Sequence, residues 1–139
     1  MVPHTNLASA LVEKGLLREA ADHYEKALQF EPDSILALNN LAWLMSVGPD
    51  DSLRNNALGL KLALKANELS NNTNALSMRA LAAAYAQAGQ FEKAIDTAQR
   101  GAEIADRQGK QTLARKIMED VDLYQRHEPL RDPALRNAQ

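Results

Sequence analysis

The chain has 139 residues, of which 45% are hydrophobic and 24% are charged, and it contains no cysteine. This length allows one domain or one short array of repeats. The lack of cysteine excludes disulfides, thiolate zinc sites and cysteine nucleophiles. The net charge of -2 disfavours a nucleic-acid partner, because such partners require a basic surface. The longest apolar run, Ala80–Ala86, is far shorter than the roughly 20 residues of a transmembrane helix, so we expect no membrane insertion of this segment.

Residues 1–34 show the periodicity of two consecutive helices. Apolar residues recur at helical spacing on either side of Gly15, namely Leu7, Leu11, Ala20, Tyr24 and Ala27. Glycine favours the turn that would separate the two helices. Pro32 ends the second helix because it lacks an amide donor and clashes with the preceding turn. The pattern therefore predicts helices over 4–14 and 17–30. Because the helical pattern begins so early, we expect the chain to be a piece of a longer polypeptide.

The same pattern returns twice further along the chain. Residues 75–108 repeat it at one constant displacement, with Leu81, Tyr85, Gly89 and Ala94 in the places of Leu7, Leu11, Gly15 and Ala20. Residues 35–74 repeat it with an inserted segment, 48–56, between the two halves. The four further helices that this register predicts span 35–47, 57–70, 75–88 and 91–107.

A last amphipathic stretch follows the third repeat. After Gln108-Gly109, apolar residues recur on one helical face at Leu113, Ile117, Val121 and Tyr124. This spacing predicts a helix over 110–126 that caps the end of the array, as terminal repeats require. Residues 127–139 contain two prolines and little periodicity, so we expect an irregular tail, with Leu130 folded back toward the array.

Helix pairs with these small and aromatic positions resemble the tetratricopeptide repeat (TPR) family. The stretch Asn40-Leu41-Ala42-Trp43-Leu44, together with Arg79–Ala86, resembles the C-terminal TPR units of long bacterial TPR proteins. Three residues depart from the family pattern: His4 stands where a large apolar residue is usual, and Gly59 and Gly101 stand where alanine is usual. The resemblance implies an all-α, right-handed α-solenoid of three TPR hairpins plus a C-terminal capping helix. Its parts would be TPR unit 1 (1–34), TPR unit 2 (35–74, with the inter-helix loop 48–56), TPR unit 3 (75–108), the capping helix (109–126) and the irregular tail (127–139).

The residues on the repeated faces form the predicted core. It comprises Leu7, Leu11, Leu17, Ala20, Tyr24, Leu38, Leu41, Met45, Leu62, Leu81, Tyr85, Phe91, Ala94, Ile95, Leu113, Ile117 and Tyr124.

No constellation of residues indicates catalysis. The histidines His4, His23 and His127 share no metal-ligand spacing, and the chain has no glycine-rich phosphate loop, nucleophile elbow or zinc-protease motif. We therefore expect no enzyme activity, no catalytic residues, no metal and no cofactor.

The predicted helix 35–47 has an unusual face opposite its core stripe. Leu36, Asn40, Trp43 and Val47 cluster there, where a solvent-exposed helix would be polar. The resemblance to TPR proteins implies that the first helices of the units line a concave groove. The predicted partner-binding groove comprises Leu36, Asn39, Asn40, Trp43, Val47, Leu76, Arg79 and Ala83.

Two interpretations of these residues remain open. In one, Trp43 anchors a peptide while Asn39, Asn40 and Arg79 hold its polar groups, since tryptophan and arginine are enriched at interface hot spots. In the other, Trp43 packs on the insertion or a neighbouring helix, and Asn40 and Arg79 are solvated or make intramolecular contacts. Some TPR co-chaperones grip a C-terminal carboxylate, but of their clamp residues this chain matches only Asn40.

The favoured function is a non-catalytic protein–protein interaction module that binds a peptide or partner helix in the groove. The alternative is a structural spacer or self-association segment of a larger bacterial TPR protein, with a homo-oligomer forming through an exposed repeat edge. The composition describes a soluble segment and leaves the compartment open between cytoplasm and periplasm.

Overall fold

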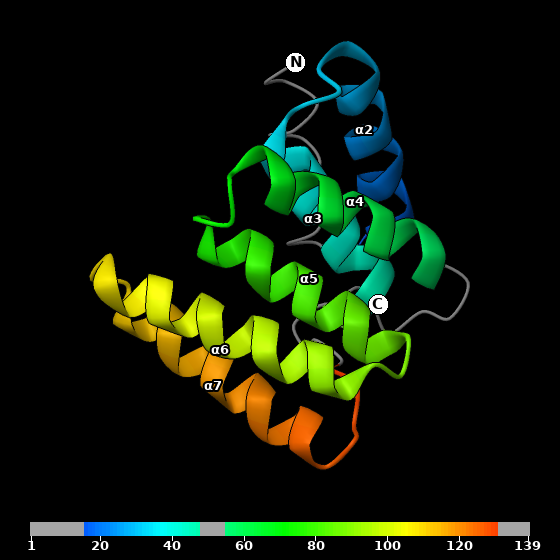
Figure 1. Ribbon diagram of the computed structural model, residues 1–139. Coiled ribbons are helices and arrows are strands. Elements are labelled where there is room, and N and C mark those ends of the chain that lie inside the picture. The colour runs from blue at the N-terminus through cyan, green and yellow to red at the C-terminus, as the bar shows by residue number, and fades with distance from the viewer. Residues whose placement is uncertain (1–15, 48–54, 131–139) are drawn as a thin grey trace.

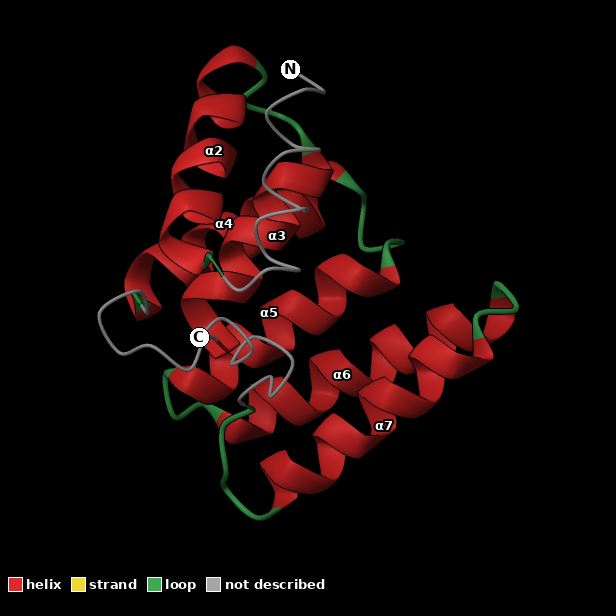
Figure 2. Cartoon of the chain, turned by 180° about the vertical axis from the view of Figure 1, so that it is seen from behind, coloured by secondary structure: helices red, strands yellow, loops and turns green. Residues whose placement is uncertain are grey.

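The computed structural model describes residues 16–47 and 55–130 of the chain, and within these ranges all regular structure is helical (Figures 1 and 2). The helices stack in chain order from α2 at one end to α7 at the other (Figure 1). Each helix packs against the next, and α3 also packs against α5. With the labels of Figure 1, the helices are α2 (Leu17–Phe30), α3 (Ile35–Val47), α4 (Asn56–Leu69), α5 (Ala75–Gln87), α6 (Phe91–Arg107) and α7 (Gln111–Gln125).

The predicted helices from residue 17 onward agree with these bounds to within one residue at either end. The all-α fold class is confirmed, with adjacent helices packed as in a TPR solenoid. The predicted helix over 4–14, most of the insertion 48–56 and the tail beyond residue 130 lie outside the described residues.

Local hydrogen bonds explain where several helices begin and end. Ser34, Asn55 and Asn74 each accept a hydrogen bond from the backbone N–H three residues further on, at 3.3, 3.1 and 3.1 Å, which satisfies a free amide of the first helical turn. Gly89 and Gly109 follow α5 and α6 with φ of 81° and 76°, the left-handed conformation that closes a helix C-terminus. Side chains and glycines thus place the turns independently of the core.

Small residues allow the helices to approach closely. Several alanines on the facing surfaces have no exposed area, among them Ala20, Ala42, Ala63, Ala82, Ala94 and Ala98. A Cβ atom on Gly101 of α6 would lie 3.1 Å from the Met78 Cβ of α5. A Cβ atom on Gly59 of α4 would lie 3.0 Å from the Ser46 Oγ of α3. Gly59 and Gly101 therefore stand at positions where a methyl group would crowd the facing helix, α3 for Gly59 and α5 for Gly101.

Most of the predicted core is buried in the structure. The buried members are Leu17, Ala20, Tyr24, Leu38, Leu41, Met45, Leu81, Ala94, Ile117 and Tyr124. Five others lie at the edges of the buried clusters and are only half-buried: Leu62, Tyr85, Phe91, Ile95 and Leu113. These five pack against the buried clusters as partly buried residues, so they belong to the core as predicted. Leu7 and Leu11 lie outside the described residues.

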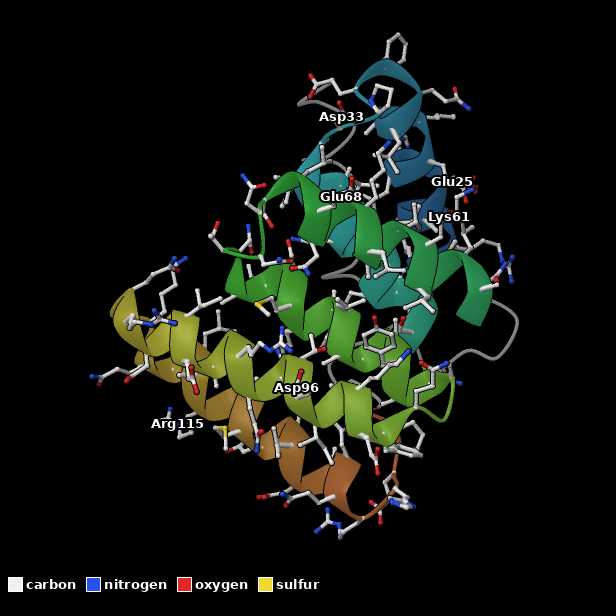
Figure 3. All side chains as sticks on the ribbon, viewed as in Figure 1. Glu25, Asp33, Lys61, Glu68, Asp96 and Arg115 are labelled. Carbon is white, nitrogen blue, oxygen red and sulfur yellow. The ribbon has the colours of Figure 1, made fainter. Side chains whose placement is uncertain are left out.

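The outer surface is charged, with acidic and basic side chains interspersed. Glu25, Lys61 and Arg115 are exposed on three different helices (Figure 3). Ion pairs on this surface are solvent-exposed, such as Lys65–Asp33 at 3.4 Å, and each contributes little to stability. The ion pair between Arg79 and Asp120 differs from these surface pairs, because the Asp120 side chain is buried.

Candidate functional site

A pocket of about 200 Å³ opens between the N-terminal halves of α3 and α5. Its walls come from the first two turns of each helix together with Trp43 one turn further along α3. The lining residues are Leu36, Asn39, Asn40, Trp43, Leu76, Arg79 and Ala80. The structure thus brings together six of the predicted groove residues and adds Ala80, a neighbour in the same register.

The repeat register explains why a pocket forms here. Leu36 and Leu76 occupy the same place in α3 and α5, and so do Asn40 and Ala80. Trp43 likewise corresponds to Ala83. Where α3 carries the larger side chain, α5 carries only a methyl group. Two adjacent helices with the same geometry but unequal side chains leave a hollow beside the larger ones.

The mouth of the pocket is apolar. The side chains of Leu36 and Leu76 are among the most exposed large hydrophobics of the described residues, at 55% and 51%. Trp43 is half-buried and packs against the clusters that include Leu41 and Leu81. An aromatic wall flanked by two exposed leucines differs from an ordinary solvated helix face, which carries polar side chains.

Arg79 is held from two sides at the wall of the pocket. Its guanidinium carbon lies 4.6 Å from the centre of the Trp43 ring, within the range of a cation–π contact. Its Nε and Nη2 donate to the Asp120 carboxylate of α7 at 2.7 and 3.2 Å. The side chain of Asp120 is only 3% exposed and that of Arg79 is 20% exposed. The predicted intramolecular contact of Arg79 is therefore present, and Trp43 packs against neighbouring helices as the second interpretation expects.

The two asparagines of the pocket differ in burial. Asn40 is half-buried, whereas Asn39 is 8% exposed. The Oδ1 atom of Asn39 is buried and has no hydrogen-bond partner among the described residues. A buried amide that lacks a partner costs about 1–3 kcal/mol. Asn39 is thus a pocket residue with unused hydrogen-bonding capacity.

Val47 and Ala83 were predicted to line the groove, and the structure places them elsewhere. Val47 has no exposed area and Ala83 is 2% exposed. Both belong to the buried cluster around Leu41, against which Leu130 packs after the chain leaves α7. The return of the chain at Leu130, which the sequence predicted, covers the cluster at the C-terminal ends of α3 and α5. We correct the groove accordingly and leave these two residues out of the proposed site.

A second hollow lies between α6 and α7. It has a volume of about 520 Å³ and is therefore larger than the pocket beside Trp43. Its walls consist mainly of exposed long side chains, including Gln99, Glu103, Asp106 and Arg115. Such side chains are flexible and solvated, and this hollow has no aromatic wall. We therefore regard the pocket between α3 and α5 as the candidate site.

Asp120 is the site residue that sequence reasoning missed. The signal was available, because Asp120 lies three residues after Ile117 and four before Tyr124, on the same face as both. A carboxylate on an apolar stripe requires a partner, and here that partner is Arg79.

Tyr124 lies close to this ion pair. Burial raises the pKa of the Tyr124 hydroxyl well above its ordinary value, and the negative charge of Asp120 raises it further. Its hydroxyl oxygen is buried without a hydrogen-bond partner among the described residues. The capping helix α7 thus places the Asp120 carboxylate and the neutral Tyr124 phenol close to Arg79 of α5.

Within the described ranges, no three or more histidine, aspartate or glutamate side chains are grouped so as to hold a metal ion. No helix in that part of the chain combines the length and the apolar composition needed to cross a membrane.

The stacked helix pairs define a helical-repeat protein. A family model described as tetratricopeptide repeat matches residues 3–34, which include α2. The match identifies a tetratricopeptide repeat in this part of the chain, a kind of repeat that generally mediates protein–protein interaction and is typically non-catalytic. No match is found among curated proteins.

Proposed function

We propose that the chain binds a partner protein through an extended peptide segment that seats an apolar side chain in the pocket between α3 and α5. Trp43 forms the floor for that side chain, and Leu36 and Leu76 close over it from the two helices. The proposal rests chiefly on one observation: two exposed leucines and the chain's single tryptophan surround one hollow.

The apolar contacts supply a useful part of the binding free energy. Full burial of a leucine side chain stabilises a complex by about 1.5–3 kcal/mol. Leu36 and Leu76 each keep about half of their surface exposed, so covering both contributes about 2 kcal/mol. That is roughly a 30-fold gain in affinity. A small pocket of this kind therefore discriminates between peptides even when the rest of the contact is weak.

Asn39 gives the pocket a polar requirement. Its buried amide oxygen has no partner in the described part of the chain. A peptide backbone can offer an N–H group beside an apolar side chain, and pairing it with the Asn39 amide would recover the cost of the unmet hydrogen bond. An extended peptide meets this requirement more readily than a helix, whose backbone groups are already paired.

A peptide selection tests the proposal. Random 12-residue peptides displayed on phage are selected on the wild-type protein and then measured against two double variants. Leu36→Ala/Leu76→Ala removes the mouth of the pocket. The matched control, Leu64→Ala/Leu69→Ala, removes two leucines of α4 that are 43% and 38% exposed and do not line the pocket. Because Trp43 is the chain's only tryptophan, its fluorescence reports on the pocket without any label.

The expected result is a set of peptides that shift the Trp43 emission and bind the pocket variant about 30-fold more weakly, while the control variant binds as the wild type does. Equal binding to both variants, or no peptide recovered, contradicts the proposal. Sedimentation adds a separate measurement: a mass that rises with protein concentration, with no peptide bound at Trp43, would favour the alternative of a self-association segment.

A further inference from the structure

The charged residue that lines the candidate pocket, Arg79, is paired with a residue that does not line it, Asp120. Arg79 is the only charged side chain among the described residues that line the pocket. Its guanidinium lies between the Trp43 ring and the Asp120 carboxylate, which accepts from both Nε and Nη2. Asp120 does not line the pocket but lies behind Arg79 on α7. The positive charge at the wall is therefore cancelled by a buried negative charge in direct contact with it.

We propose that Asp120, acting through Arg79, makes the pocket select an uncharged apolar side chain and reject carboxylates. A carboxylate that enters the pocket would find the Nε–Nη2 edge of the guanidinium already occupied by Asp120 and would be repelled by the charge of Asp120. An apolar side chain meets neither obstacle and packs on Trp43. This inference rests on the proposed function and adds the chemical class of residue that the partner presents.

The position of Asp120 supports a role beyond packing. The neighbouring positions on its face of α7 are Ile117, Val121 and Tyr124, all buried. An apolar side chain at position 120 would continue that stripe. Replacing a buried ion pair with apolar residues is often neutral or stabilising. The carboxylate is therefore not required to hold α7 against the array, whereas it is required to fix and neutralise Arg79. Asp120 is a positioning residue in this sense.

Collisional quenching of Trp43 measures the charge of the pocket directly. Iodide carries a negative charge and acrylamide carries none, so the ratio of their quenching constants reports the local charge and cancels changes in access. The ratio is measured at constant ionic strength for the wild type, Asp120→Asn, Arg79→Met and the neutral double variant Arg79→Met/Asp120→Leu. Far-UV circular dichroism confirms that each variant is folded.

The expected ratio is the same for the wild type and the double variant, because both pockets are neutral. Asp120→Asn should raise it about twofold, as a single uncompensated positive charge a few ångströms away would do under salt screening. A wild-type ratio well above that of the double variant shows an uncancelled Arg79 charge and overturns the inference. That comparison decides the question even if neither single variant folds.

Peptide binding separates this inference from the function beneath it. Peptides selected on the wild type are resynthesised with the anchoring apolar residue replaced by glutamate. We expect the glutamate peptides to bind the wild type poorly, and Asp120→Asn to improve their affinity relative to the parent peptides about fivefold. Wild-type protein that prefers the glutamate peptides refutes the selectivity while leaving peptide binding intact. If no peptide binds at Trp43, the proposed function fails, and the quenching ratios still decide whether Asp120 neutralises the pocket.

Discussion

Breaking the Arg79–Asp120 pair should destabilise the fold by unequal amounts, depending on which partner is removed. Arg79→Met removes the guanidinium that donates twice to the Asp120 carboxylate, whose side chain is 3% exposed. Asp120→Asn leaves a guanidinium that is 20% exposed and still contacts the Trp43 ring. Removing the partner of the more deeply buried charge lowers the free energy of unfolding by the larger amount, because less water can replace the missing partner.

The structure sets the size of each effect. Removing one member of a buried ion pair typically costs about 3–5 kcal/mol. Arg79→Met should cost about 4 kcal/mol, within that range, because the Asp120 side chain is almost fully buried. Asp120→Asn should cost about 2 kcal/mol, because the remaining guanidinium is partly solvated and keeps its aromatic contact. The double variant Arg79→Met/Asp120→Leu should cost about 1 kcal/mol or less.

Urea denaturation followed by far-UV circular dichroism measures these free energies of unfolding. Trp43 fluorescence is unsuitable as the reporter here, because the substitutions alter its immediate surroundings. The double variant should lose at least about 3 kcal/mol less than the two single variants lose together. Additive losses, or a larger loss for Asp120→Asn than for Arg79→Met, would refute the reasoning.

Three further predictions concern single side chains. Because burial raises the pKa of Tyr124, the folded chain keeps a proton that the unfolded chain releases above about pH 10. The free energy of unfolding should therefore fall as the pH rises past 10, and Tyr124→Phe should remove that part of the fall in urea titrations. Gly101→Ala should destabilise by about 1 kcal/mol in the same assay at neutral pH, because crowding against the Met78 Cβ at 3.1 Å outweighs the gain in helix propensity; a rise in stability would show that α6 can shift. Asn74→Ala removes the hydrogen bond from the Ser77 N–H at 3.1 Å and should lower the unfolding midpoint by an amount equivalent to about 1 kcal/mol, whereas an unchanged midpoint would mean that water replaces the cap.

The helices could be predicted closely because their signals are local. Periodic apolar positions fix the buried face of each helix, and residues such as Asn74 and Gly109 fix its start or the turn that follows it. Both kinds of signal are contained within one or two turns of sequence. The periodicity does not show that Phe91 and Leu113 stay half-buried, because whether an apolar residue is fully covered depends on what packs over it. That information is tertiary and does not appear in the periodicity of one helix.

The candidate site was predictable only as far as the repeat register reaches. Superposing the registers of the first helices placed Leu36, Asn40 and Trp43 near Leu76 and Arg79, and the pocket contains all of them. The register gives the direction of a side chain around its helix. It does not show that the cluster containing Val47 is packed against from elsewhere in the chain, as it is by Leu130. A helical wheel therefore overestimates the length of an exposed groove.

The capping helix and the chain that follows it explain the two residues of the site that the sequence did not place correctly, Asp120 and Val47. α7 supplies Asp120 to the wall of the pocket, and the chain that leaves α7 carries Leu130 back to the cluster that contains Val47. Both contacts are made by a helix whose sequence indicates only that it ends the array. A cap that merely shielded the apolar end of α6 would need neither a buried carboxylate nor a returning leucine. The cap thus contributes the charge balance of the pocket and covers the neighbouring cluster. For that reason, removing α7 should alter binding at Trp43 even where α3 and α5 remain folded.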